Sequence, residues 1–324
     1  MKFSKRGLIW LGTAFSIILF VIVLARLNWH TFFSTLRVLS LPTLFFTGLI
    51  LSFNIALRAV RWNLIANKSL THFNSFWQAT NIGYLGNMIY PARAGEILRM
   101  IAIHRFISLV LGRAVSSVVI DRMLDLIMAG LFMLVVLWIH GNQINPTLGR
   151  SVLGVFLITT LILVFVIGFA HSLHLRLKAW TVQGRWQHLK EGGLQALEGV
   201  QGLRKAHHLL TIILLTLFIF GLDYYAIWQV MFAFGWQLPY EAALTVGVFI
   251  VLGISLPSSP GYIGVYQIAC VFSLALYHIE ESSAVAYSII LQLTVFLVIG
   301  VQGILVTTYC GFDLSQERQV KLKY

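Results

Sequence analysis

Long apolar runs constrain this chain more than any other feature of its sequence. An α-helix needs about 20 apolar residues to cross the hydrocarbon core of a bilayer. Runs of this kind cover residues 8–25, 41–57, 114–139, 152–170, 209–234 and 284–309. Because lipid cannot hydrogen-bond to a backbone, such segments fold as helices. The sequence therefore predicts an all-α, multi-pass membrane protein with about six full transmembrane helices.

Composition excludes a soluble domain built around one buried core. The chain is 58% hydrophobic and 10% charged, and its mean hydropathy of +0.85 is typical of a protein surrounded mostly by lipid. We expect a single transmembrane domain over residues 1–324. No small-residue cleavage site follows the first apolar run, so this run is interpreted as a signal anchor that stays in the protein.

Basic residues predict the orientation of the chain. There are 23 Lys and Arg against 11 Asp and Glu, for a formal net charge of +12. They gather at the N-terminus, in a segment at about residues 171–206 and in the C-terminal tail. Lys and Arg near helix ends collect on the cytoplasmic side of an inner (plasma) membrane. Both termini and a basic loop at 171–206 are therefore predicted to be cytoplasmic. Topology and anionic lipid account for the charge, so nucleic acid is not an expected partner.

Cysteine and histidine indicate neither a disulfide nor a metal site. Cys270 and Cys310 lie in apolar segments, where a free thiol behaves as a small hydrophobic group. The histidines lack the spacing of metal ligands. We therefore expect no metal and no cofactor.

A count of membrane crossings leaves residues 76–113 to enter and return on the same side. Two spans bring the chain to the inside near Arg58 and Arg61, and the basic loop requires the 114–139 span to start there as well. The apolar pieces 76–90 and 97–111 are short for a full crossing, and Pro91 and Gly95 separate them. A re-entrant pair of half-helices fits both observations.

The second half repeats this arrangement from the opposite side. Residues 241–278 lie between the last two spans and are interrupted at Pro257, Pro260, Gly261 and Gly264. Two interrupted hairpins that enter from opposite sides indicate an inverted repeat. In transporters, breaks of this kind near the middle of the membrane mark binding sites.

The predicted breaks favour an anion. Proline is preferred in the first turn of a helix, so Pro91 and Pro260 are each expected to begin a half-helix whose free N–H groups face the membrane interior. Two such ends can hold a phosphate or carboxylate. Arg93, Glu96 and Arg99 follow at spacings of three, and arginine suits phosphate. The alternative is that these charges only anchor a short helix at the interface.

Three further residues beside the breaks complete the candidate headgroup-binding set. They are Asn87, Gly261 and Tyr262.

A second group of charges lies in the 114–139 and 209–234 spans. Asp121 and Asp125 share a helix face, and Arg122 can pair with Asp125. These residues are expected to balance Arg93 or Arg99, to relay protons or to bind a cationic headgroup. A simple interfacial ion cluster is the alternative. Asp223 is a candidate proton or headgroup site, with hydrogen bonding to Tyr or Ser as its alternative.

These motifs resemble one membrane-protein family. The motifs are Gly86-Asn87-x-x-x-Pro91-x-Arg93-x-Gly95-Glu96-x-x-Arg99, Asp121-Arg122-x-x-Asp125 and Pro257-x-x-Pro260-Gly261-x-x-Gly264-Val265. In order and spacing they are similar to the transmembrane region of the lysylphosphatidylglycerol synthase and flippase family. That family includes the membrane half of the multiple peptide resistance factor and stand-alone inner-membrane proteins. Asp121 is a departure, since the family often has Glu there.

The resemblance implies a flippase or scramblase that moves an anionic or aminoacylated phospholipid of the phosphatidylglycerol type. It does not imply lipid synthesis, because the family's aminoacyl transfer belongs to a separate soluble domain that we do not expect in residues 1–324. The expected protein is therefore not an enzyme. The expected partner is membrane phospholipid, and a separately encoded lipid synthase and a homo-oligomer are left open.

Two other functions are weighed against translocation. One is a transferase or accessory protein for polyprenyl-phosphate or hopanoid lipids, with Glu96 or Asp121 as a base. The other is a passive scaffold for a synthase, which would need no charges in the middle of the membrane. The lipid, the direction of movement and proton coupling as opposed to passive scrambling are left open.

Overall fold

The structure is a computed structural model that describes residues 28–90, 93–141, 144, 146–180, 185–201, 206–255 and 259–312. These residues form helices and no strand. The first part of the chain contains α2 (Trp29–Arg37), α3 (Leu41–Ile65), η1 (Leu70–His72), α4 (Phe73–Ile89), α5 (Gly95–Ile107), α6 (Leu111–His140) and α7 (Pro146–Ala179). The second contains α8 (Arg185–Gln201), α9 (Ala206–Ala233), α10 (Tyr240–Ser255), η3 (Pro260–Tyr262), α11 (Val265–Ala275) and α12 (Glu281–Cys310).

Five of the described helices are long and apolar enough to cross a membrane. They are α3, α6, residues Gly149–Ala179 of α7, α9 and α12. Four of them contain a whole predicted span, and α9 covers all but the last residue of the 209–234 span. The all-helical class is confirmed. The predicted span at 8–25 lies outside the described residues. The 41–57 span is longer than expected, because α3 continues to Ile65 through Arg58 and Arg61.

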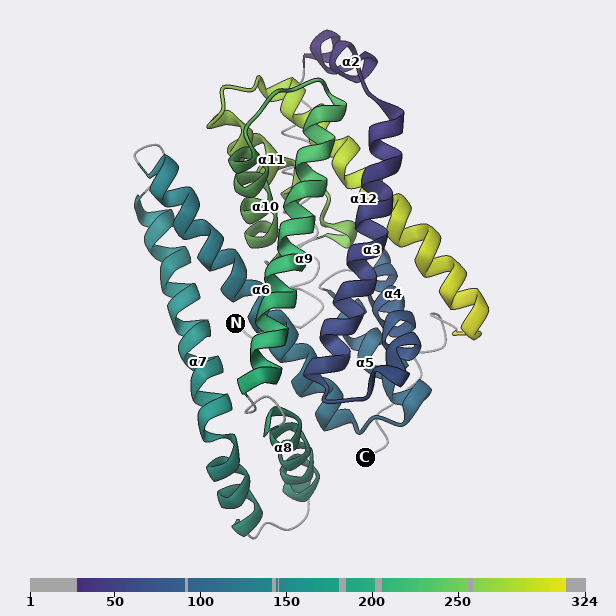
Figure 1. The fold of residues 1–324 in the computed structure, drawn as a ribbon, viewed down its shortest axis with the longest axis vertical. Coiled ribbons are helices and arrows are strands. Elements are labelled where there is room, and N and C mark those ends of the chain that lie inside the picture. Colours follow the sequence, from purple (N-terminus) through teal and green to yellow (C-terminus); the bar gives the residue numbers. More distant parts are fainter. Residues whose placement is uncertain are drawn as a thin grey trace, which may run out of the picture.

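Two hairpins of short helices occupy the two segments that were predicted to be interrupted, residues 76–113 and 241–278. α4 packs against α5, and α10 packs against α11. Figure 1 shows the α4/α5 hairpin in the lower half of the molecule and the α10/α11 hairpin in the upper half, with both breaks toward the middle. Their placement relative to a bilayer and the inverted repeat stay predictions.

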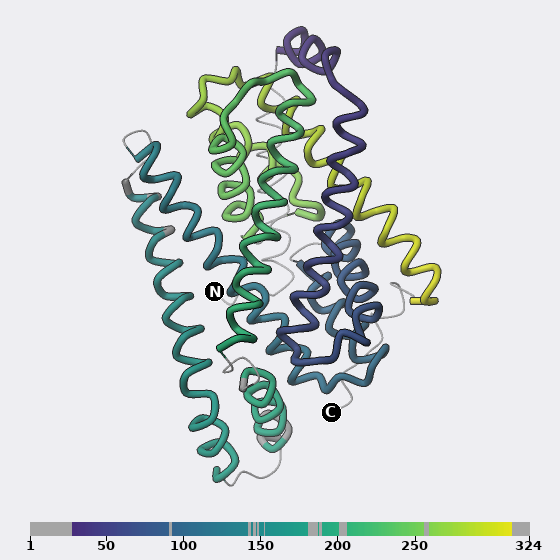
Figure 2. Tube along the Cα trace, viewed as in Figure 1, coloured from purple at the N-terminus to yellow at the C-terminus, as the bar shows by residue number. Residues whose placement is uncertain are grey.

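The basic segment at 171–206 is largely helical, whereas the sequence analysis expected a loop. α7 continues to Ala179, and α8 follows and packs against both α6 and α7. Figure 2 shows α8 at the lower end of the molecule, beside the end of α7. Arg113 of α6 lies 3.6 Å from the carboxylate of Glu198. α8 therefore forms part of the helical bundle, with its cytoplasmic position still a prediction.

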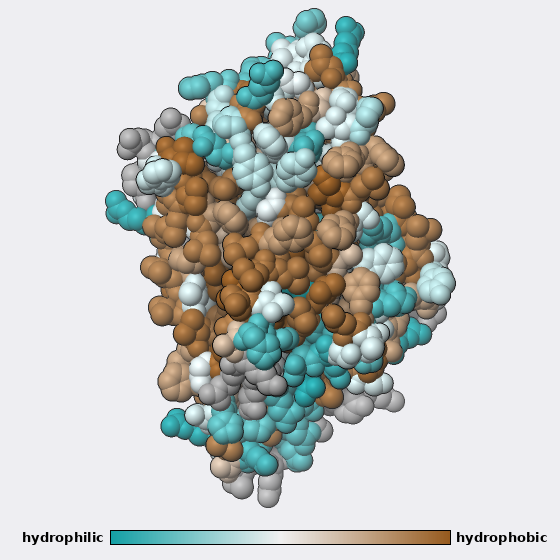
Figure 3. Space-filling view, viewed as in Figure 1, coloured by the Kyte–Doolittle hydropathy of each residue, from teal (hydrophilic) through white to brown (hydrophobic). Residues whose placement is uncertain are grey.

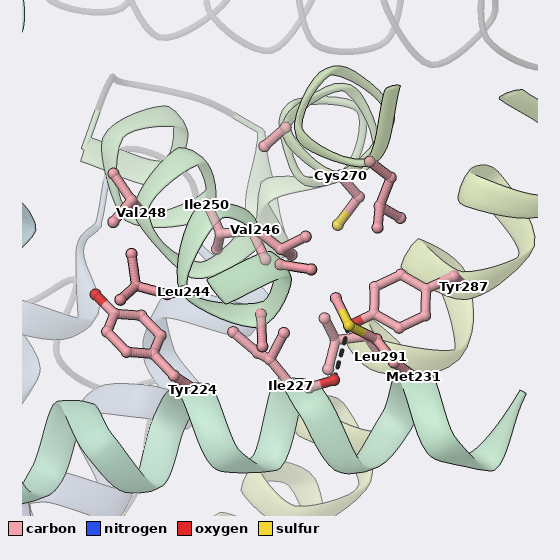
Figure 4. Close-up of a cluster of buried hydrophobic side chains, with 14 of the residues drawn as sticks. Tyr224, Ile227, Met231, Leu244, Val246, Val248, Ile250, Cys270, Tyr287 and Leu291 are labelled. Carbon is pink, nitrogen blue, oxygen red and sulfur yellow. Dashed lines mark hydrogen bonds between the residues drawn. The ribbon is translucent and has the colours of Figure 1, made fainter. Parts of the chain in front are cut away.

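The upper hairpin is held in place by an apolar cluster. Figure 4 shows side chains of α9, α10, α11 and α12 meeting in this cluster, with Tyr287 donating a hydrogen bond to the carbonyl oxygen of Ile227 over 2.9 Å. A Cβ on Gly247 would lie 2.3 Å from the ring of Tyr224. This glycine therefore allows α10 to approach α9 closely, as small residues do between membrane helices.

The surface is apolar along the middle of the molecule. In Figure 3 a hydrophobic zone separates more hydrophilic upper and lower ends on the face shown. α7 contributes exposed Leu157, Leu161 and Phe165. This distribution is typical of a protein whose middle faces hydrocarbon.

Candidate functional site

Arg93 lies at the break between α4 and α5. Its φ of 56° is in the left-handed region, which few residues other than glycine adopt and which the surrounding structure must stabilise. The Arg93 Nε atom donates a hydrogen bond to the carbonyl oxygen of Ile254 over 3.0 Å. Ile254 is in the last turn of α10, where carbonyls have no partner within the helix. Arg93 therefore connects the two breaks. Pro91 lies outside the described residues.

The second break is organised by glycines and amide side chains. Gly261 and Gly264 have φ angles of 64° and 90°. The Gln292 side chain donates to the Gly261 carbonyl oxygen over 2.6 Å and accepts a hydrogen bond from Gln267 over 2.6 Å. The Gly264 N–H in turn donates to the Gln267 side chain over 2.7 Å. The Gly261 carbonyl and the Gly264 N–H are thus satisfied from within the protein.

Pro260 does not begin the half-helix that the sequence analysis placed there. It opens the short η3, and α11 begins at Val265 with Gly264 as its N-cap residue. The positive φ angles at Gly261, Tyr262 and Gly264 end one helix before the next can start. Pro257 lies outside the described residues.

Asp121 is the centre of a buried ion-pair network. Asp121 is 2% exposed and lies 2.7 Å from Arg61, 3.0 Å from Arg99 and 2.8 Å from Arg122. Arg99 is also 2.7 Å from Glu96, and its guanidinium group lies 4.8 Å from the centre of the Trp62 ring. Asp121 therefore lies within ion-pair distance of Arg99 across helices, and its role in the site stays a prediction.

A second layer of ion pairs faces inward from α3, α6 and α9. Arg122 lies 3.1 Å from Asp125 and 3.7 Å from Glu96. Arg58 forms an ion pair with Asp223 and lies 3.8 Å from Asp125. The side chain of Asn54 donates to Asp223 over 2.9 Å. This layer joins three spanning helices to the α4/α5 hairpin through Glu96.

These side chains line a cavity of about 340 Å³. Eight of the predicted site residues line it, namely Asn87, Arg93, Glu96, Arg122, Asp125, Asp223, Gly261 and Tyr262. Arg99 and Asp121 do not line the cavity and belong to the buried ion-pair network. The cavity volume lies at the lower end of the range of ligand pockets, about 300–1,000 Å³.

Arg58, Arg61 and Tyr224 are site residues that the sequence analysis missed. It used the two arginines only to mark the inner end of a span. Their spacing of three residues, directly after the apolar run of 41–57, was the available signal that they continue one helix face. Nothing in the sequence distinguished Tyr224 from its neighbouring aromatic residues, because its position depends on the packing of α9 against α10.

Arg93 is the cavity arginine best placed to meet an anion. Arg58 and Arg122 are engaged by carboxylates, whereas Arg93 forms no ion pair within 4 Å with any described residue. The Tyr224 hydroxyl and the Arg122 Nε atom are buried and make no hydrogen bond within the described part of the chain. The cavity thus offers one arginine that forms no ion pair within 4 Å among the described residues, together with additional donors, and this combination suits a phosphate group.

Together, the apolar spanning helices and the charged internal cavity define an integral membrane protein of the all-helical class. The family described as lysylphosphatidylglycerol synthase TM region matches residues 9–303. The chain belongs to this family. No curated protein and no solved structure matches the chain.

Proposed function

We propose that this protein is a lipid translocator of the cell inner membrane. In this proposal the headgroup of an anionic or aminoacylated phospholipid of the phosphatidylglycerol type enters the cavity and passes between leaflets. The observation that carries the proposal is Arg93, which lines the cavity at the meeting point of two helix breaks and forms no ion pair within 4 Å with a carboxylate of the described residues. Membership in a family named for a lipid enzyme's membrane region supports a role in lipid handling.

Arg93 is assigned to the lipid phosphate. The start of α5, only two residues further along the chain, adds the positive end of a helix dipole to the same place. Glu96, Asp125 and Asp223 keep Arg58 and Arg122 compensated, so the cavity does not hold several bare cations at once. Arg99, expected from sequence to bind the headgroup, is assigned instead to the supporting network because Asp121 and Glu96 both engage it.

The transferase alternative gains no support from the geometry. Asp121, one of its two candidate bases, is shared by Arg61, Arg99 and Arg122 and does not line the cavity. A carboxylate in such surroundings is engaged by its three partners and out of reach of a substrate. Glu96 lines the cavity but is likewise paired with arginine.

The proposal is tested by lipid movement in proteoliposomes. Arg93→Gln is expected to slow transbilayer movement of fluorescent phosphatidylglycerol by about 10- to 100-fold, because a hydrogen bond to a charged group contributes about 1.5–3 kcal/mol. Arg105→Gln is the matched control, since Arg105 is exposed on α5, the helix that follows Arg93, and does not line the cavity.

The lipid panel should also contain lysylphosphatidylglycerol and an undecaprenyl-phosphate analogue. Movement that depends on Arg93 but not on Arg105 supports the proposal and identifies the headgroup. Equal lipid movement by the Arg93→Gln and Arg105→Gln proteins would show that Arg93 does not take part in translocation. Movement of none of the lipids by wild-type protein would reject translocation.

A further inference from the structure

One wall of the cavity is formed by the contact between two helices, which we call the α3–α12 seam. α3 and α12 lie in contact, and their inward faces supply apolar lining at Leu51, Ile55, Val295 and Ile299. Their outward faces carry large exposed hydrophobic side chains on both helices. These are Leu49, Phe53, Leu297, Val301 and Leu305. The contact between α3 and α12 therefore separates the cavity from the surface that faces hydrocarbon.

Few interactions close this seam. A Cβ on Gly48 would lie 3.6 Å from a methyl carbon of Val298, which is ordinary van der Waals contact without interlocking. The Gln302 side chain donates a hydrogen bond to the Ser52 hydroxyl group. Such bonds between membrane helices contribute little, since the separated groups find other partners.

Neighbouring walls are more firmly held. α3 is joined to α9 by the Arg58–Asp223 ion pair and by Asn54. α4 meets α12 where the Leu85 side chain packs on Gly303. A Cβ added to Gly303 would lie 2.7 Å from the Cβ atom of Leu85. Opening the cavity along either of these lines would break an ion pair or close packing, whereas separation of α3 from α12 would break the hydrogen bond between Gln302 and Ser52.

We propose that the α3–α12 seam is the lateral portal through which the hydrocarbon chains of a bound lipid extend from the cavity into the bilayer. The inference rests on the proposed function and specifies how the lipid is held. A cavity of about 340 Å³ accommodates a headgroup, whereas a phospholipid with two long chains exceeds such a volume. The chains must therefore leave the cavity, and the wall lined by Leu51, Val295 and Ile299 offers them an apolar exit.

A cross-link across the seam tests the portal. In a parent protein carrying Cys270→Ala and Cys310→Ser, the pair Gly48→Cys and Val298→Cys should form a disulfide under oxidation, because a Cβ on Gly48 would lie 3.6 Å from a methyl carbon of Val298. Movement of fluorescent phosphatidylglycerol in proteoliposomes is then expected to fall to the rate of protein-free vesicles and to recover on reduction. The matched control is Thr35→Cys with Ser283→Cys. That pair joins α2 to α12 through hydroxyl groups 3.1 Å apart, and its oxidation should leave movement unchanged.

Each outcome separates the portal from the proposed function. Full movement by the oxidised Gly48/Val298 pair would overturn the portal and leave translocation intact. Absence of movement by the parent protein would instead reject translocation.

A second measurement does not depend on disulfide formation or on movement. Phosphatidylglycerol with a photoactivatable group on one acyl chain should label peptides of α3 and α12 around the seam in the full chain. Labelling there no stronger than along α7, whose exposed face is equally apolar, would overturn the portal.

Discussion

Asp121 shows how charge can be accommodated deep in an apolar protein. Its two oxygens serve Arg61, Arg99 and Arg122, and both Arg61 and Asp121 are almost completely buried. Burial removes water from all of these groups, so each charge depends on the others for compensation. The spacing of Asp121 and Asp125 indicated an ion cluster. Arg61 joins that cluster from α3, 60 residues earlier in the chain, and no local pattern indicated this partner.

Loss of the shared carboxylate should destabilise the fold. Asp121→Asn leaves buried arginines undercompensated and is expected to lower the free energy of unfolding by about 3–5 kcal/mol. The midpoint of unfolding in detergent measures the change. Glu198→Gln removes half of an exposed pair with Arg113 and should cost about 1 kcal/mol or less. Equal effects of the two substitutions would contradict the proposed importance of the buried network.

At the scale of the elements, the α4/α5 hairpin depends on close backbone contact. Sequence analysis assigned Gly95 to the helix break, but it is the first residue of α5, and the left-handed backbone falls on Arg93 instead. A Cβ on Gly95 would lie 1.9 Å from the Gly83 carbonyl oxygen and 2.5 Å from the Asn87 nitrogen. Glycine is thus required here because two helices touch, and not because of an unusual φ angle.

Gly95→Ala should therefore disrupt the hairpin. We expect a loss of stability of at least about 1–3 kcal/mol, the range for overpacking, because the obstacle is backbone that cannot rotate away. Gly221→Ala is the control, since a Cβ at this position in α9 would meet nothing within 4 Å. That substitution should be neutral or stabilising by up to about 1 kcal/mol. The unfolding midpoints of the two variants measure this difference in stability. A Gly95→Ala protein as stable as wild type would disprove the tight contact of Gly95 with Gly83 and Asn87.

For the whole molecule, the two hairpins lie toward opposite ends of the long axis while their breaks meet near the middle (Figure 1). The lower end carries α8 and the end of α3. Lys190 belongs to α8, and Arg113 lies beside Glu198 of the same helix. Because basic residues collect on the cytoplasmic side, this end is predicted to face the cytoplasm. The charged cavity would then lie between the two membrane surfaces, where a translocator needs it.

Labelling from one side of the membrane tests this orientation. In the Cys270→Ala, Cys310→Ser parent, Gln187→Cys in α8 should react with an impermeant maleimide only after the cells are permeabilised. Ser151→Cys, near the opposite end of α7, should react in intact cells. Both native side chains are exposed, so burial does not account for a difference. The reverse pattern would invert the predicted topology.

The sequence by itself determined the class of the protein, the positions of most spanning helices and the two interruptions. These properties follow from local features, namely the length of apolar runs and the placement of proline and glycine. Tertiary structure alone decided which charges face the cavity and which are buried behind it. Arg93 and Arg99 are similar in sequence context, yet of these two arginines only Arg99 lies against Asp121. A charge's role depends on the partners that packing brings within a few ångströms, and those partners come from distant helices.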